Sequence, residues 1–190
     1  LHRWYRAVVD DAVLQTRSEI ADGGVEGVEI LEPVRRVKRC VSNLNGFPFN
    51  DPYGMKYQWH IINDGTQWSG YKAGADINVC KVYEEYTGGS PEVIVAVVDG
   101  GIQLNHKDLA DVTLPAQKGG SRNFVKYNYV IDADDHGSHV AGIIGAINNN
   151  AFCGCGVAGG LDGNGGVRLM SCEVFSGNSS GNFADAIVWA

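Results

Sequence analysis

Two side chains with complementary acid–base chemistry stand at the ends of strongly patterned segments. Asp99 follows the apolar run 93–98 and precedes two glycines, whereas His136 follows an acidic run and opens a segment of apolar and small residues. A carboxylate that hydrogen-bonds an imidazole fixes the tautomer of the ring and makes it a usable general base. Asp99 and His136 are therefore candidate catalytic residues, provided that the fold brings them together.

The run before Asp99 predicts how that carboxylate is positioned. Residues 93–98 are six consecutive apolar residues, mostly β-branched. Such a run is typical of a strand buried on both faces of a parallel sheet that helices flank. In these sheets the functional groups lie just beyond the carboxyl ends of the strands, which is where Asp99 stands.

A helix is predicted over residues 136–147, with Asp134 or Asp135 as its N-cap. Gly142 and Gly145 within it each cost about 1 kcal/mol relative to alanine. We expect close packing of the helix on the sheet to compensate for that cost.

The remaining segments are less strongly patterned. Residues 168–175 predict a second strand, residues 73–86 a helix, and residues 181–190 the beginning of another helix. Residues 41–70 carry many turn-forming residues and predict an ordered but irregular linker. Residues 1 to about 40 predict a small β-α-β tail.

Composition narrows the class of protein. The chain has 190 residues, a net charge of −7 and five cysteines. The acidic balance argues against nucleic acid as a partner, and no apolar run is long enough to cross a bilayer. The odd cysteine count without a CxxC pair is neither a zinc pattern nor a complete disulfide framework. The chain begins with Leu1 and ends inside an apolar helical pattern, so we expect it to be a fragment.

The segments around both candidates resemble the motifs of the subtilisin-like serine proteases, or subtilases. Residues 95–102, followed by 105–109, resemble the aspartate motif of that family. Residues 136–142 resemble its histidine motif, with Ser138 where threonine is commoner. The likeness extends over about residues 50–190.

This resemblance implies an α/β fold, with a subtilisin-like, mostly parallel sheet flanked by helices and incomplete at the C-terminus. It implies a serine endopeptidase that hydrolyses polypeptides through an Asp-His-Ser triad, in which Asp99 orients His136 as general base. The nucleophilic serine and the oxyanion asparagine of the family would lie beyond this chain, so we expect the fragment alone to be inactive. Four serines lack a nucleophile context, namely Ser138, Ser176, Ser179 and Ser180.

Further sites follow from the resemblance alone. Asp51, Asp108, Ile147 and Asn149 resemble the oxygen ligands of a structural calcium site. Ser179, Ser180 and Gly181 resemble the edge that binds an extended substrate by strand addition.

The resemblance also implies a domain organisation. Residues 1–45 would be the C-terminal part of an inhibitory propeptide with its junction, near the basic run 35–39, and residues 46–190 the N-terminal half of the peptidase domain. The protein would then be a zymogen, with its own propeptide as a partner, and would be secreted or held at the cell surface.

Other interpretations remain open on the sequence. His136 and His139, with Asp134 or Asp135, have metal-ligand residue types. Residues 154–159 fit GxGxxG, which indicates dinucleotide binding only between a buried strand and a helix. The chain also fits a non-catalytic relative of the subtilases that acts in binding.

Two further short patterns in the sequence indicate other sites. The Cys153-Gly154-Cys155 segment is compatible with a metal or a redox bond, and Asn178 begins a glycosylation sequon.

Overall fold

A computed structural model describes residues 47–190, all of which belong to the compact unit Arg39–Ala190. The predicted tail at residues 1–40 lies outside the described residues. The described elements are, in chain order, α2 (Gly54–Tyr57), α3 (Cys80–Glu85), β1 (Ile94–Gly100), β2 (Arg122–Asn123), α4 (Asp135–Gly145), β3 (Arg168–Ser176), β4 (Ser179–Ser180) and α5 (Phe183–Trp189).

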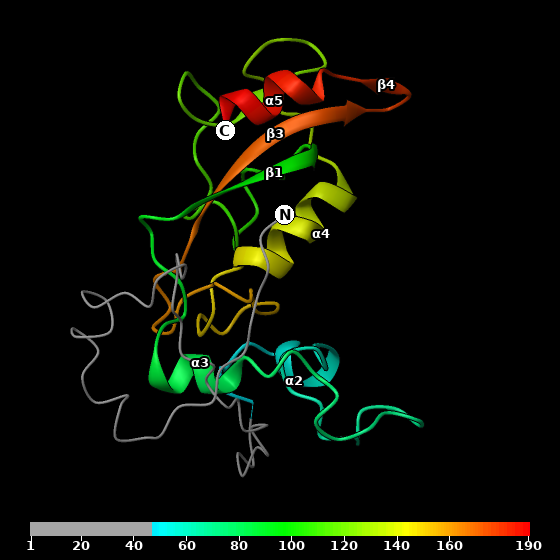
Figure 1. The fold of residues 1–190 in the computed structure, drawn as a ribbon, viewed down its shortest axis with the longest axis vertical. Helices are drawn as coiled ribbons and strands as arrows, with labels where there is room; N and C mark the ends of the chain where they lie inside the picture. Colours follow the sequence, from blue (N-terminus) through cyan, green and yellow to red (C-terminus); the bar gives the residue numbers. More distant parts are fainter. Residues whose placement is uncertain (1–46) are drawn as a thin grey trace, which may run out of the picture. The chain divides into compact units, whose positions relative to one another are not determined.

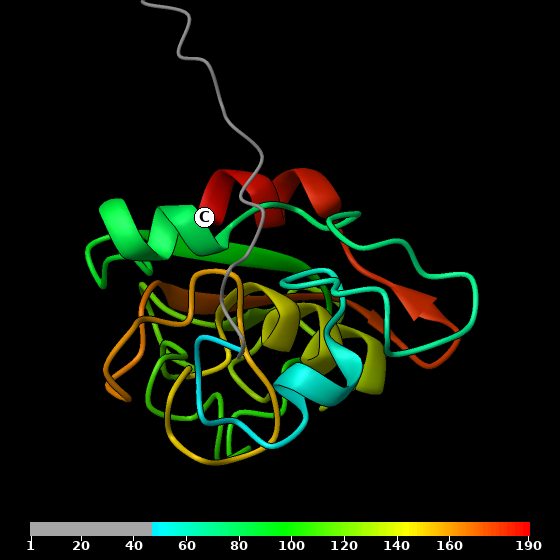
Figure 2. The ribbon, with the colours of Figure 1, turned by 90° about the horizontal axis from the view of Figure 1, so that it is seen from below.

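The centre of this unit is a mostly parallel sheet with the strand order β1-β3-β2. The short strand β4 pairs antiparallel with the end of β3. Helix α4 covers one face of the sheet and α5 covers the other (Figures 1 and 2). The predicted α/β class is thereby confirmed.

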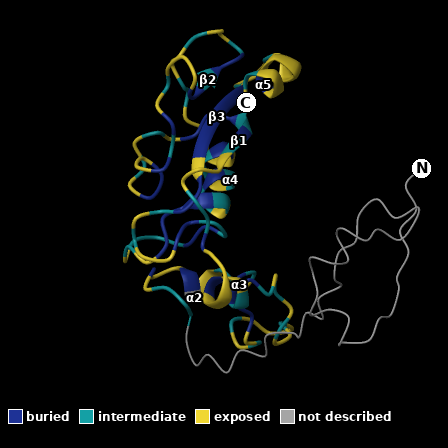
Figure 3. Ribbon diagram, turned by 60° about the vertical axis from the view of Figure 1, so that its left-hand side comes forward, coloured by how far each residue is buried: buried dark blue, intermediate teal, exposed yellow. Residues whose placement is uncertain are grey.

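Strand β3 is buried on both faces because helices cover both sides, and its residues 169–174 are all buried (Figure 3). Successive side chains point to opposite faces. Leu169 packs with Ala141 of α4, whereas Met170 packs with Ala186 of α5. The predicted strands at 93–98 and 168–175 therefore form the middle layer of the fold.

Helix α4 is held close to the sheet at Gly145, as expected, and also at Gly137, but not at Gly142. A Cβ atom at Gly137 would collide with the carbonyl oxygen of Gly100, and one at Gly145 would meet Leu169 within 3.2 Å. At Gly142 there is open space. Packing thus accounts for Gly145, as predicted, and not for Gly142.

A separate cluster joins the N-terminal part of the described chain to a later loop. It contains Ile61, Tyr83 and Cys155. The helix predicted over residues 73–86 is much shorter, because the preceding turn is fixed by Asp76. Its carboxylate accepts a hydrogen bond from the Asn78 amide at 2.8 Å.

The backbone of Asn78 is accordingly left-handed, with φ of 57°, which a helix does not allow. Residues 47–70 are irregular apart from α2, in agreement with the sequence. No helix among residues 47–190 is both long and apolar enough to span a membrane.

Candidate active site

Asp99 and His136 meet at the carboxyl end of β1. The Nδ1 atom of His136 lies 2.8 Å from the Oδ1 atom of Asp99, a hydrogen-bonding distance. Asp99 is the last residue but one of strand β1, and His136 lies in the first turn of α4. The side chain of Asp99 is 20% exposed and that of His136 is 75% exposed. The pair thus has a sheltered carboxylate and an accessible ring.

Asp134 fixes the beginning of the helix that carries His136. Its Oδ2 atom accepts hydrogen bonds from the amides of His136 at 2.9 Å and of Gly137 at 3.1 Å. The sequence had left Asp134 and Asp135 as alternative caps, and the cap is Asp134. Its own amide donates to the carbonyl of Gly101 at 2.7 Å, which ties the helix start to the turn after Asp99.

The carboxylate of Asp99 raises the pKa of His136 above its ordinary value. The cause is the hydrogen bond, followed by the attraction between the charges. A ring held through Nδ1 keeps Nε2 for proton transfer, which is the arrangement of a general base. Among residues 47–190 the ring of His136 is hydrogen-bonded to no serine.

The serines singled out in the sequence have other roles here. The Ser138 hydroxyl accepts from the amide of Gln103 at 2.9 Å, and the Ser176 hydroxyl donates to Asp132 at 3.2 Å. Ser179 and Ser180 form the exposed strand β4.

The residues that come together at the start of α4 differ from those of the metal site considered from the sequence. Ligand atoms of Asp99, Asp134 and His136 lie within 4.8 Å of one another, and within the described part of the chain no other such group exists. His139 is exposed and is not among them. Asp134 caps the helix and Asp99 holds His136, so hydrogen bonds within the protein explain this proximity.

The predicted calcium residues gather around two buried carboxyl groups. Asp51 is 3% exposed and Asp108 is 2% exposed. Burial raises the pKa of Asp108, and the charge of Asp51 raises it further. The Ile147 amide donates to the Asp108 carbonyl at 3.2 Å. The groups that contact the two carboxylates are hydrogen-bond donors, namely the Asn149 amide on Asp51 and the Asn150 side-chain nitrogen on Asp108. The two neighbouring carboxyl groups themselves are ligands of the kind that a hard cation prefers.

Asn149 does not place its side chain against Asp108. Its side-chain oxygen accepts from the Asn50 amide, and its nitrogen donates to the Leu161 carbonyl. The side chain that reaches Asp108 is that of Asn150, with Nδ2 at 2.6 Å from Oδ1. Only the Asn149 amide takes part, through a bond to Asp51 at 2.7 Å. The sequence has three consecutive asparagines, and nothing in it indicated which of their side chains reaches Asp108.

The segment 154–159 has neither a strand before it nor a helix after it. It lies in the long connection between α4 and β3, which removes the structural context that dinucleotide binding requires. Cys153 and Cys155 are free thiols. The Cys155 thiol donates to Asp51 at 3.3 Å, and burial raises its pKa.

The predicted substrate edge lies at the tip of a hairpin. Strand β4 pairs with β3 alone among the described residues, and its side chains are exposed. The Gly181 amide donates to the Val174 carbonyl at 2.7 Å, and a Cβ at Gly181 would collide with the backbone of Phe124.

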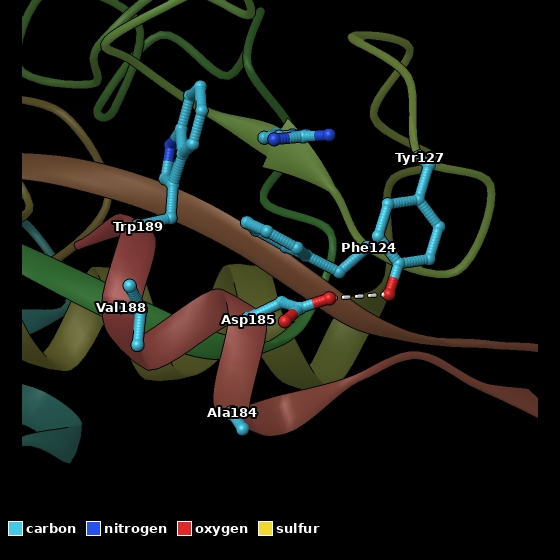
Figure 4. A pocket seen from close by; sticks show the side chains of 7 residues that line it. Phe124, Tyr127, Ala184, Asp185, Val188 and Trp189 are labelled. Carbon is cyan, nitrogen blue, oxygen red and sulfur yellow. Dashed lines mark hydrogen bonds between the residues drawn. The ribbon is translucent and has the colours of Figure 1, made fainter.

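A shallow pocket beside α5 is lined by neither Asp99 nor His136. Figure 4 shows Phe124, Tyr127, Asp185 and Trp189 around it, with the Tyr127 hydroxyl donating to Asp185 at 2.7 Å. The Arg122 guanidinium lies 4.7 Å from the centre of the Trp189 ring. Cation–π contact thus links β2 to α5, away from the acid–base pair.

Comparison with known proteins places the chain in a family. Residues 90–190, more than half of the chain, match the model of the Subtilase family. The chain therefore belongs to the subtilases. Among its relatives, the PC3-like endoprotease variant B of Hydra vulgaris is 37% identical over 149 residues, which are 76% of this chain and 19% of that protein.

A bacterial relative and a solved structure agree with this family. The thermophilic serine proteinase of Bacillus sp. (strain AK1) is 30% identical over 164 residues, covering 83% of this chain and 38% of that protein. The crystal structure of a serine protease of Aeromonas sobria has a TM-score of 0.61 and 28% identity, over 84% of this chain and 26% of that chain. The chain thus spans well under half of each of these proteins.

Proposed function

We propose that the whole protein is a serine endopeptidase and that this chain supplies the acid–base half of its active site. The observation that carries the proposal is the 2.8 Å contact between His136 Nδ1 and Asp99 Oδ1, formed by residues of the family's two motifs. The nucleophile would be a serine outside this chain.

His136 would act on that serine through Nε2. It takes the hydroxyl proton as the oxygen attacks the substrate carbonyl, and then gives the proton to the leaving amine. Asp99 holds the ring by Nδ1 and stabilises the imidazolium that forms. Water then attacks the acyl-enzyme. His136 takes a proton from this water and gives it to the serine oxygen, which leaves as the acid product is released.

The proposed substrates are polypeptides in extended conformation. Ser179, Ser180 and Gly181 would pair with the substrate backbone as an added strand, for which the exposed side of β4 offers an edge. Asp51, Asp108, Ile147 and Asn149 would bind a calcium ion through oxygen atoms. The ion would stabilise the fold and take no part in the reaction.

The proposal includes residues 1–45 as the end of an inhibitory propeptide, and hence a secreted or cell-surface zymogen. The basic run 35–39 near the proposed junction supports this. One related crystal structure is a complex of the Aeromonas sobria serine protease with a chaperone, ORF2. In that structure the protease is 29% identical over 76% of this chain.

The test uses the full-length protein with a peptide substrate and a fluorophosphonate probe that labels activated serines. His136→Ala and Asp99→Asn should each lower kcat by about 10⁴-fold and abolish labelling. His139→Ala, which changes an exposed histidine on the same helix, should retain activity. Unlabelled wild-type protein, as expected of a non-catalytic binding relative, would overturn the proposal.

A further inference from the structure

A buried acid lies beside the pair and is used neither by the mechanism nor by the calcium site. Glu173, on β3, has an exposed fraction of 0%. It is the register partner of Asp99 on β1 and of Asn123 on β2. Partners in adjacent parallel strands project to the same face of a sheet, so Glu173 and Asp99 both lie on the α4 face.

Glu173 holds the backbone of the segment that leads into α4. Its Oε2 atom accepts a hydrogen bond from the amide of Asp132 at 2.8 Å. Its Oε1 atom is buried and has no hydrogen-bond partner among residues 47–190. The Asn123 amide group on the neighbouring strand donates instead to the Val130 carbonyl at 3.1 Å.

Residues 132–134 are thus fixed from two sides. On one side Ala133 forms a parallel bridge with Gly101, just after Asp99. On the other side Glu173 holds Asp132. The next residue, Asp134, caps α4 and so sets the position of His136.

We propose that Glu173 is a positioning residue for the Asp99–His136 pair, acting through the Asp132 backbone. Without its carboxyl group the Asp132 backbone loses its hydrogen bond to β3, and the Ser176 hydroxyl still reaches only the Asp132 side chain. The ring is then free to shift relative to Asp99. The expected effect on catalysis rests on the proposed function. The structural test of the positioning role does not depend on it.

The protonation state of Glu173 changes the charge next to the segment that it holds. Burial raises the pKa of Glu173, the Asp132 amide opposes that rise, and the Asp132 charge adds to it. The titratable groups on the elements that meet here are Asp99 on β1, Lys126 and Asp132 in the loop, and Asp134 and His136 at the start of α4. Stability from neutral Glu173 is therefore full below the ordinary glutamate pKa and is lost as pH rises through the raised value.

The first experiment observes the Nδ1 proton of His136 by NMR in this chain. A proton shared with Asp99 resonates far downfield, and we expect this signal in the wild type and in Glu173→Gln, which keeps an acceptor for Asp132. Glu173→Ala should broaden or abolish it. Glu85→Ala, which removes an exposed surface acid, should leave it unchanged. A folded Glu173→Ala variant with an unchanged signal would overturn the inference.

A pH titration decides the question even if Glu173→Ala fails to fold. In the wild type, the Asp132 amide and the His136 ring should share a titration step, because ionisation of Glu173 disturbs both. Glu173→Gln should remove that step. If the shared titration step persists in Glu173→Gln, it belongs to another group, and the positioning role of Glu173 is refuted.

In the full-length enzyme, Glu173→Ala should lower kcat by up to about 10²-fold with KM nearly unchanged, because misplacement affects the reacting groups more than substrate binding. Glu173→Gln should restore most of the loss. A change in KM alone would contradict the positioning role. If the full-length wild type is inactive, the proposed function fails, whereas the NMR results still decide the role of Glu173.

Discussion

At the residue scale, the protonation of His136 depends on one neighbouring carboxylate. Asp99 raises the pKa of the ring through a hydrogen bond and through its charge. A histidine whose pKa is higher in the folded state stabilises the fold fully below its unfolded pKa, and this contribution is lost as pH rises through the folded value. The pair therefore favours the folded state most at mildly acidic pH.

Asp99→Asn should lower the pKa of His136 towards the ordinary histidine value, because the amide carries no charge. Titration of the ring protons of His136 by NMR measures this directly. Denaturant unfolding should show a larger loss of stability near pH 5.5 than near pH 8.5. A loss that is equal at both pH values would contradict the hydrogen-bonded ion pair.

Residue types predicted the acid–base pair because Asp99 and His136 each follow a strong local signal, a buried strand and a capped helix start. Asn150 and Glu173 carried no such signal. Asn150 sits within three identical residues, and only the folded loop selects the side chain that reaches Asp108. Glu173 is the only acidic residue of β3. The importance of its position comes from register with Asp99, which is a property of the assembled sheet.

At the scale of elements, the glycines of α4 provide a matched test of how closely the helix approaches β1. Gly137→Ala should destabilise the fold by about 1–3 kcal/mol, because the new Cβ collides with the Gly100 carbonyl. Gly142→Ala faces open space and should stabilise the helix by about 0.5–1 kcal/mol. Urea unfolding of the two variants measures both values, and effects of the same sign would mean that the packing described here is wrong.

Periodicity predicted β1, β3 and α4 nearly to their ends because each has one dominant pattern and clear boundary residues. It failed for the helix predicted over residues 73–86, where apolar spacing competed with local side-chain chemistry. Asp76 and Asn78 form a turn that hydrogen-bonds the backbone in place of a helix. Only α3, after that turn, follows the helical pattern.

At the scale of the whole described unit, Asp51 joins the N-terminal segment to the loop after α4. Its carboxylate accepts from the amides of Asn149 and Asn150, and Tyr53 donates to the Cys153 carbonyl at 2.8 Å. The nearby Asp108 has its pKa raised by burial. Stability from its neutral form is therefore lost as pH rises through that raised pKa, because the charge of Asp51 repels that of ionised Asp108.

Calcium should relieve that repulsion and raise the thermal midpoint of this chain at pH 7.5. At a concentration 100 times Kd the gain is about 2.7 kcal/mol, or roughly 5–10 °C for a chain of this size. The Asp51→Asn/Asp108→Asn double variant should be insensitive to calcium, because neutral amides do not attract the ion. Asp111→Asn, at an exposed position, should respond like the wild type. Thermal melts with calcium, magnesium or chelator measure the effect, and equal shifts in the wild type and the double variant would place the ion elsewhere.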